Sequence, residues 1–190
     1  ERDMQDAGFH RDRHQRWTKD GRRARIELLT TSGNPLRLKA VQLLAAQLTS
    51  AGFDPTISVL RPEVFFASYV ARGRFDMALY AFSQGIDPSL TKYFACSEVA
   101  RAPNWAGKNN FHYCRPNLDR LLERADRELD VTQRAATTHA IIERIATDVP
   151  TIPLYQVPDT LAWNKRVHGV RPNSLGRHLW NVDEWWVDRR

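Results

Sequence analysis

Histidines and cysteines are the residues of this sequence with the clearest potential for metal chemistry. His10 and His14 are four positions apart, so on a helix they would share one face and could bind the same metal. Cys96, His112 and Cys114 would provide three soft ligands. The histidine pair has no carboxylate–histidine signature around it, and the spacing of the two cysteines has no chelating logic. The sequence therefore predicts neither a metal site nor a cofactor.

Carboxylates and nucleophiles do not indicate an enzyme either. Asp76 and Asp87 could flank a pocket as paired carboxylates, but Asp76 begins a predicted strand and Asp87-Pro88 is typical of a turn. The sequence lacks a glycine-rich phosphate loop and a nucleophile elbow. The six tryptophans are expected mostly in core or interface packing. We therefore expect a protein that is not an enzyme.

The two cysteines allow two interpretations. In a reducing compartment Cys96 and Cys114 would be free thiols, whereas in an exported protein they would pair and close a loop of about 19 residues. The segment between them is rich in Asn and contains Pro103 and Gly107, so it would gain stability from a cross-link. The residues alone do not decide between the two interpretations.

Composition excludes several classes of protein. Of the 190 residues, 42% are hydrophobic and 26% charged, which excludes wholesale disorder. No apolar run is long enough for a transmembrane helix, and no N-terminal stretch resembles a signal peptide. Because the sequence opens without an initiator methionine, we expect a piece of something longer. The net charge is +6, but 23 of the 28 basic residues are Arg, and those within 120–134 alternate with Asp and Glu as on a solvated helix face. A nucleic-acid partner is therefore not expected.

The elements of the first half of the chain alternate between strands and helices. Strands are expected at residues 26–31, 56–60 and 76–82, and helices at 35–51 and 62–73. This βαβαβ order predicts an α/β fold with a mostly parallel sheet, and right-handed crossovers are expected to place both helices on one face. Ligands of such sheets lie beyond the carboxyl ends of the strands, which singles out the loop after Phe82.

The remaining segments are predicted to be helical or irregular. Residues 9–25 are polar, with a tight turn at Asp20-Gly21. The elements expected after the sheet are a helical turn at 90–95, helices at 117–129 and 132–148, an extended stretch at 150–155 and a strand at 161–163. Asn117 is the expected N-cap of the first long helix, and Leu129 the last residue of its apolar face.

Several short segments follow one another in an order that matches a known family. They are residues 7–9 (AGF), 20–28 (DGRRARIEL), 40–53 (AVQLLAAQLTSAGF), 73–79 (GRFDMAL), 109–122 (NNFHYCRPNLDRLL) and 148–155 (DVPTIPLY). In this order they resemble the C-terminal part of the family 5 extracellular solute-binding proteins. These proteins are the oligopeptide, dipeptide and nickel receptors of ABC importers.

The resemblance implies a lobe of the type II periplasmic-binding-protein-like fold. Such a lobe is an α/β layer in which a βαβαβ sheet is flanked by helices, followed by a C-terminal helical pair and a return strand. Residues 1–25 would be a lead-in from the preceding lobe, 26–157 the solute-binding lobe and 158–190 a return segment. Family members are two-lobed and longer, so the chain would be roughly the last third of one.

The resemblance also implies a function. The chain would be the solute-binding component of an ABC import system for peptides or a peptide-like solute, working with permease subunits and the missing N-terminal lobe. The protein would be exported, to the periplasm or the outer face of the cytoplasmic membrane, with lipoprotein anchoring as one option. An exported location favours the disulfide between Cys96 and Cys114. The alternative function is a solute-binding-like envelope module that acts in assembly or signalling through protein contacts.

The ligand-binding residues implied by the resemblance follow the third predicted strand. They are Phe82, Ser83, Gln84, Gly85 and Asp87. Peptide receptors of the family place an aspartate in this loop, where it holds the amino terminus of the peptide. Gln84 takes that place here, and a neutral amide does not offset an ammonium charge as a carboxylate does.

Overall fold

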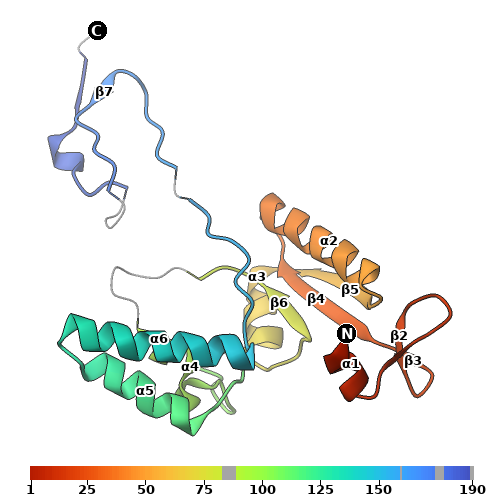
Figure 1. Ribbon diagram of the computed structural model, residues 1–190. Coiled ribbons are helices and arrows are strands. Elements are labelled where there is room, and N and C mark those ends of the chain that lie inside the picture. The colour runs from red at the N-terminus through yellow and green to blue at the C-terminus, as the bar shows by residue number, and fades with distance from the viewer. Residues whose placement is uncertain (83–88, 159, 174–177, 189–190) are drawn as a thin grey trace. The chain divides into compact units, whose positions relative to one another are not determined.

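The computed structural model describes residues 1–82, 89–158, 160–173 and 178–188 (Figure 1). The described residues form two compact units. The larger unit comprises Glu1–Phe82 and Ser89–Thr151, and the smaller one contains the described residues from Ile152 onward.

The larger unit begins with a short helix and a small antiparallel sheet. The helix is α1 (Arg2–Asp6), and the strands β1 (His10–Arg11), β2 (Trp17–Lys19) and β3 (Arg22–Arg23) pair in the order β1-β2-β3. The sequence favours a helix that ends at Gly8, in agreement with α1, but for residues 9–25 it predicted only polar chain with a tight turn at Asp20-Gly21, both of which have positive φ. The three strands form around Trp17, which is 2% exposed and has the Arg11 guanidinium 4.1 Å from its ring centroid.

The centre of the larger unit is the predicted parallel sheet. Its elements are β4 (Arg25–Thr31), α2 (Pro35–Ser50), β5 (Asp54–Leu60), α3 (Pro62–Val64), the π-helix η1 (Phe65–Val70) and β6 (Met77–Leu79). The strand order is β5-β4-β6 and both pairings are parallel, which confirms the predicted sheet. Strand β6 is shorter than predicted, because its pairing with β4 ends at Leu79, opposite Thr30.

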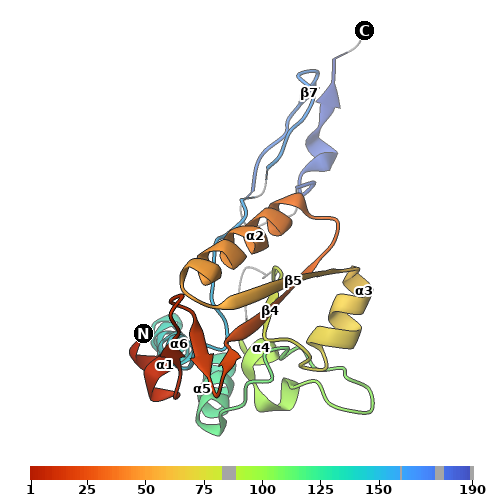
Figure 2. The ribbon, with the colours of Figure 1, turned by 90° about the vertical axis from the view of Figure 1, so that its right-hand side faces the viewer.

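The two connecting helical segments lie on opposite faces of the sheet, and the expectation that they share one face was wrong (Figures 1 and 2). The chain steps from β4 to β5 in one direction and from β5 across β4 to β6 in the other. Right-handed connections in opposite directions place their helices on opposite faces. In agreement, Leu29 packs with Phe65 and Val70 of η1, while its neighbour Leu28, on the other face of the strand, is also buried.

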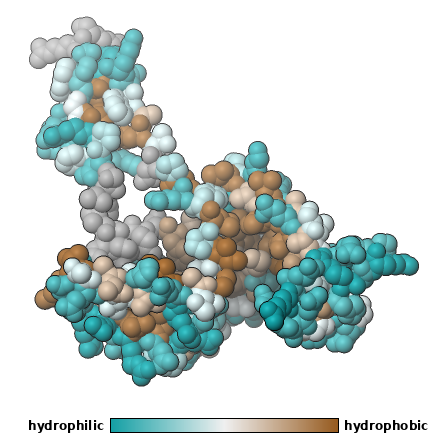
Figure 3. Space-filling model, in the orientation of Figure 1, coloured by the Kyte–Doolittle hydropathy of each residue, from teal (hydrophilic) through white to brown (hydrophobic). Residues whose placement is uncertain are grey.

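Helix α2 has apolar residues on both its buried and its solvent-facing sides. Val41 is fully buried, whereas Leu36 and Leu43 are exposed, together with Ile57 and Val59 of the edge strand β5. Figure 3 shows this apolar surface over the sheet layer, next to the hydrophilic surface of the β1–β3 region.

The second half of the larger unit is a helical pair preceded by a disulfide-closed loop. Its elements are α4 (Thr91–Phe94), the 3₁₀ turn η2 (Cys96–Glu98), α5 (Pro116–Arg127) and α6 (Val131–Asp148). Leu118 and Leu122 of α5 and Ile141 of α6 are buried in one core cluster with Tyr93 and Phe94 of α4.

Two details of α5 differ from the sequence prediction. The helix starts earlier, with Arg115 instead of Asn117 at the N-cap, because Pro116 fits the first helical position, which needs no N–H donor. It also ends at Arg127, so Leu129 lies outside it and is exposed. Helix α6 is capped by Asp130, whose carboxylate accepts a hydrogen bond from the backbone N–H of Gln133 at 2.8 Å.

The smaller unit contains little regular structure. Residues 152–158 are exposed and belong to no helix or strand. The elements of this unit are β7 (Val167–His168), the 3₁₀ turn η3 (Val182–Glu184) and β8 (Trp186–Val187), and β7 pairs antiparallel with β8. The strand expected at 161–163 was wrong, since these residues are irregular and the strand lies at Val167–His168. Across the described parts of the chain, none of the helices is both long and apolar enough to cross a bilayer.

Candidate ligand-binding site

Phe82 is the one predicted ligand-binding residue that the structure describes. It follows β6 at the carboxyl end of the parallel sheet, and 40% of its surface is exposed. The other four predicted residues, Ser83, Gln84, Gly85 and Asp87, lie outside the described residues.

Phe82 belongs to a set of seven rings that we call the aromatic cluster. Its members are Phe65, Phe66, Tyr80, Phe82, Tyr93, Phe94 and Phe111. The ring centroid of Phe82 lies 4.9 Å from that of Tyr80, 4.8 Å from that of Tyr93 and 5.8 Å from that of Phe111. These distances are typical of favourable aromatic pairs.

Four different parts of the larger unit supply these rings. Phe65 and Phe66 come from η1, Tyr80 and Phe82 from the end of β6, Tyr93 and Phe94 from α4, and Phe111 from the disulfide-closed loop. Phe65 belongs to the core cluster under the sheet, and Tyr93 and Phe94 belong to the core cluster of the helical pair. The exposed rings, Phe66 and Phe82, therefore rest on two hydrophobic cores.

Tyr80 brings a hydroxyl group into the aromatic cluster. Its ring contacts Phe65, Phe66 and Phe82. Burial raises the pKa of the Tyr80 hydroxyl above its usual value, so the group is neutral at physiological pH and acts as a hydrogen-bonding group.

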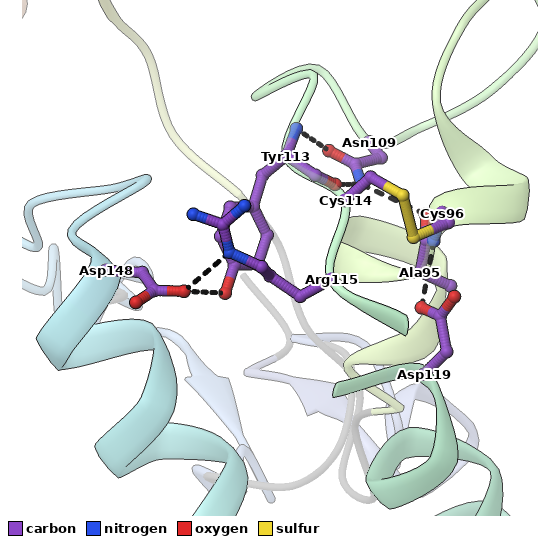
Figure 4. Close-up of a disulfide and its surroundings, with 8 residues drawn as sticks. All are labelled: Ala95, Cys96, Asn109, Tyr113, Cys114, Arg115, Asp119 and Asp148. Atoms are coloured by element: carbon purple, nitrogen blue, oxygen red, sulfur yellow. Dashed lines mark hydrogen bonds and ion pairs between the residues drawn. A yellow bond between two sulfur atoms is a disulfide. The ribbon is translucent and has the colours of Figure 1, made fainter. Parts of the chain in front are cut away.

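The disulfide Cys96–Cys114, which the exported interpretation favoured, is present and closes the loop that carries Phe111 (Figure 4). Asn109 holds this loop from within and is fully buried. Its side-chain N–H₂ group donates to the carbonyl oxygens of Ala95, at 3.0 Å, and Tyr113, at 2.6 Å. Asp119 of α5 accepts a hydrogen bond from the backbone N–H of Cys96 at 3.0 Å, which ties the loop to the helical pair.

Close backbone approaches also fix this loop. Gly73, at the end of the η1 segment, has a φ of +63°, and a Cβ there would lie 3.3 Å from the ring of His112. A Cβ on Gly107 would overlap the carbonyl oxygen of Glu98. Glycine at residue 73 therefore permits the contact between the loop and the segment after η1, and glycine at residue 107 permits a close approach within the loop itself.

A charged cluster joins the far side of the loop to the end of α6 (Figure 4). The Tyr113 hydroxyl donates to Asp148 at 2.7 Å, and Arg115 and Arg144 lie 3.1 and 3.2 Å from the same carboxylate oxygen. The hydrogen bond from Tyr113, together with the hydrogen bond from Arg115 and the charges of both arginines, lowers the pKa of Asp148. Burial and the carboxylate raise the pKa of Tyr113. This charged cluster has a structural role, because its hydrogen-bond donors are already paired with the Asp148 carboxylate.

The metal candidates of the sequence do not come together. Within residues 1–82, 89–158, 160–173 and 178–188, no three His, Cys, Asp or Glu side chains are placed to share a metal ion. Cys96 and Cys114 are consumed by the disulfide, and the Nε2 atom of His14 accepts a hydrogen bond from Arg13. Asp76 has a structural role, since its carboxylate accepts a hydrogen bond from the backbone N–H of Glu27 at 2.8 Å.

A groove lies between α5 and α6. It is lined only by residues of these two helices, among them Leu121, Ala140 and Glu143, and it contains no ring of the aromatic cluster. We therefore place the candidate site at the aromatic cluster, which adjoins the carboxyl end of the sheet.

The sequence prediction missed most of the aromatic cluster. Phe82 was identified from the end of its strand, but Phe66, Tyr93 and Phe111 are far apart in sequence and have no common spacing. The one available signal was the alternation of Tyr80 and Phe82, which places both rings on the same side of an extended chain.

Comparisons with known proteins identify similar folds. No family model matches the sequence. The oligopeptide-binding protein AppA of Bacillus subtilis (strain 168) is 23% identical over 170 residues, which cover 89% of this chain and 30% of AppA. The peptide transport periplasmic protein SapA of Haemophilus influenzae is 24% identical over 150 residues, which cover 75% of this chain and 25% of SapA.

A solved structure gives the same result at the level of the fold. NikZ from Campylobacter jejuni, determined in complex with Ni(L-His), matches with a TM-score of 0.77 and 24% identity, over 96% of this chain and 37% of NikZ. The chain therefore shares the fold of one part of these proteins and spans about a third of their length or less. As the sequence analysis expected, these relatives are binding and transport proteins, not enzymes.

Proposed function

We propose that this chain, which corresponds to about one third of a family 5 solute-binding protein, forms a ligand-binding lobe of a solute receptor in an ABC import system. The observation that carries the proposal is the exposed Phe82 at the carboxyl end of the parallel sheet, held by a rigid set of rings. Ligands of open α/β sheets bind at this edge. The relatives support the same class of function, since AppA is named for oligopeptide binding and NikZ was solved with a nickel–histidine complex.

The proposed lobe has the type II periplasmic-binding-protein-like organisation. In this proposal, residues 26–157 form the solute-binding lobe, residues 1–25 lead in from the preceding lobe and residues 158–190 return toward it. The solute would be a peptide or a peptide-like compound, and closure of two lobes around it would present it to permease subunits. The protein would be exported, in line with the periplasmic relative SapA.

Gln84 would set one part of the ligand preference. A charge-assisted hydrogen bond to a buried ammonium group contributes about 1.5–3 kcal/mol, so an amide in place of the family's carboxylate would weaken binding of free-amine peptides by roughly ten- to hundredfold. The proposed ligand therefore lacks a free amino terminus. In this proposal Ser83, Gly85 and Asp87, which are neighbours of Gln84 in sequence, also belong to the ligand-binding site.

Calorimetry on a full-length protein carrying this chain tests the proposed function. The probes are a tripeptide library, the same library N-acetylated, and a nickel–histidine complex. We expect the acetylated peptides to bind more tightly than the free ones, and Gln84→Asp to reverse the order. Tight binding of free peptides that disappears on acetylation would contradict the assignment of Gln84. Failure of every probe to bind, together with capture of an envelope protein, would favour the alternative role as an assembly or signalling module.

A further inference from the structure

We propose that Phe66, Tyr80 and Phe82 form a subsite for an aromatic side group, so that the receptor selects solutes that carry one. We call these three rings the aromatic shelf. The inference rests on the proposed function and names the chemical class of the solute.

The first argument is the exposure of the shelf. Phe66 is 42% and Phe82 40% exposed, although each contacts at least two other rings. Tyr80 lies between them, with ring centroids 5.5 Å from that of Phe66 and 4.9 Å from that of Phe82. Scattered exposed apolar residues need no explanation, but a contiguous row of aromatic rings at the ligand-binding edge of a sheet indicates a binding surface.

The second argument is the rigidity of the rings. Phe65 is fully buried, and its centroid lies 4.9 Å from that of Phe66 and 5.7 Å from that of Tyr80. Phe82 is held from the other side by Tyr93 and Phe111. Rings fixed by buried neighbours lose little conformational freedom when a ligand binds, so more of the contact free energy appears as affinity.

The third argument is the angle between the rings. The planes of Phe66 and Tyr80 meet at 89°, and those of Tyr80 and Phe82 at 55°. The three rings therefore do not lie in one plane, and two of them, Phe66 and Phe82, are exposed. An aromatic group prefers edge-to-face or offset contacts, which such a surface provides and which an aliphatic group cannot use.

Charge near the shelf restricts the solute further. The Lys92 ammonium lies 5.2 Å from the ring centroid of Tyr93, which contacts Phe82. This cation lies over a ring that supports the shelf, and like charges repel, so an ammonium group on the solute is disfavoured on the Tyr93 side of Phe82. The ligand class is a compound with an aromatic side group.

Paired probes test the inference on the full-length protein. N-acetyl-phenylalanyl-phenylalanine amide and N-acetyl-alanyl-alanine amide differ in their rings, and calorimetry measures both. We expect the aromatic probe to bind at least tenfold more tightly. Phe82→Leu and Phe66→Leu should each weaken its binding about three- to tenfold while leaving the alanine probe unchanged, because leucine keeps apolar bulk but removes the ring. The matched control is Leu129→Ala, at an exposed apolar residue outside the shelf.

The outcomes separate this inference from the proposed function. Equal affinity for the two probes in the wild-type protein, with tight binding of some other solute, would overturn the aromatic subsite and leave the proposed function intact. Failure of peptides and metal complexes alike would overturn both. Thermal unfolding of each variant identifies the remaining case. If the Leu variants lower the melting temperature but leave the affinity for the aromatic probe unchanged, another part of the protein covers the shelf. That result would also overturn the subsite.

Discussion

At the scale of single residues, Asp148 has an unusual position for a carboxylate. It is the last residue of α6, where the partial negative charge of the helix end opposes a second negative charge. Tyr113, Arg115 and Arg144 offset this opposition through one carboxylate oxygen. The stability of the helical pair therefore depends on whether Asp148 is charged.

The charge of Asp148 predicts a pH dependence of stability. Its folded pKa is lowered from 3.8, mainly by the hydrogen bond from Tyr113 and then by the two arginines. The stabilisation is therefore complete above the unfolded pKa of about 3.9 and is lost as the pH falls through the folded value. We expect Asp148→Asn to be less stable than the wild-type protein at pH 7, and this stability difference to be smaller at pH 2.5.

Urea denaturation at both pH values measures this difference. Asp6→Asn, at an exposed carboxylate of α1, is the matched control and should leave the stability at pH 7 nearly unchanged. A stability difference for Asp148→Asn that stays constant between pH 7 and 2.5 would show that the charge of Asp148 is not responsible.

Asn109 predicts a second effect at the residue scale. Its buried side chain bonds the carbonyl oxygens of Ala95 and Tyr113, and alanine would leave both without this donor. The expected loss for Asn109→Ala is about 1–3 kcal/mol of unfolding free energy, the cost of one buried polar group left unsatisfied, because the Ala95 carbonyl still accepts a hydrogen bond from the backbone N–H of Glu98. Chemical denaturation measures it, with the exposed Asn104→Ala as control. A loss below about 1 kcal/mol would mean that water replaces the amide.

At the scale of elements, the disulfide-closed loop connects the helical pair to the sheet. It carries Phe111, whose ring contacts both Phe82 and Phe94. The disulfide therefore stabilises the loop on which one side of the aromatic cluster depends.

Removal of the disulfide predicts a loss of stability. The cysteines are 18 positions apart, and the chain-entropy account of such a loop predicts that Cys96→Ser/Cys114→Ser loses about 3 kcal/mol. Guanidinium denaturation with and without reductant measures the change. Titration of the unreduced, denatured wild-type protein should detect no thiols, and two thiols per chain would refute the pairing.

The elements also show what could be predicted from sequence. Residues 26–31 and 35–50 were identified because apolar spacing and the Asn34-Pro35 start are local signals. The β1–β3 sheet was missed because its strands are two or three residues long and mostly charged, and they form around the buried Trp17. The aromatic shelf was missed, except for Phe82, because it arises only when η1 and β6 are brought together by the sheet.

At the scale of the whole molecule, the chain consists of a larger unit ending at Thr151 and a smaller unit that follows it. Residues 152–158 are exposed and make no regular backbone hydrogen bonds of a helix or strand. This segment is therefore the most accessible connection in the described part of the chain.

Limited proteolysis should cut this segment first. Chymotrypsin is expected to cleave after Leu154 or Tyr155, which are exposed in a segment without helix or strand, and to leave a fragment of residues 1–154 or 1–155. Mass spectrometry of the early products identifies the cut. Leu154→Ser/Tyr155→Ser should delay it. Early cleavage between residues 89 and 148 would show that the helical pair is less stable than its packing indicates.

The pairing of β4 with β6 also has a consequence for how the chain folds. Thr30 and Leu79 are 49 positions apart, whereas α5 and α6 are consecutive helices joined by three residues, 128–130. Contacts between distant positions form slowly because the intervening chain must first lose its freedom. The helical pair is therefore expected to form early and the sheet late, which pulse-labelled hydrogen exchange would detect as protection of α5 and α6 before β4. The aromatic shelf, which needs both η1 and β6, would then be among the last surfaces of the protein to take shape.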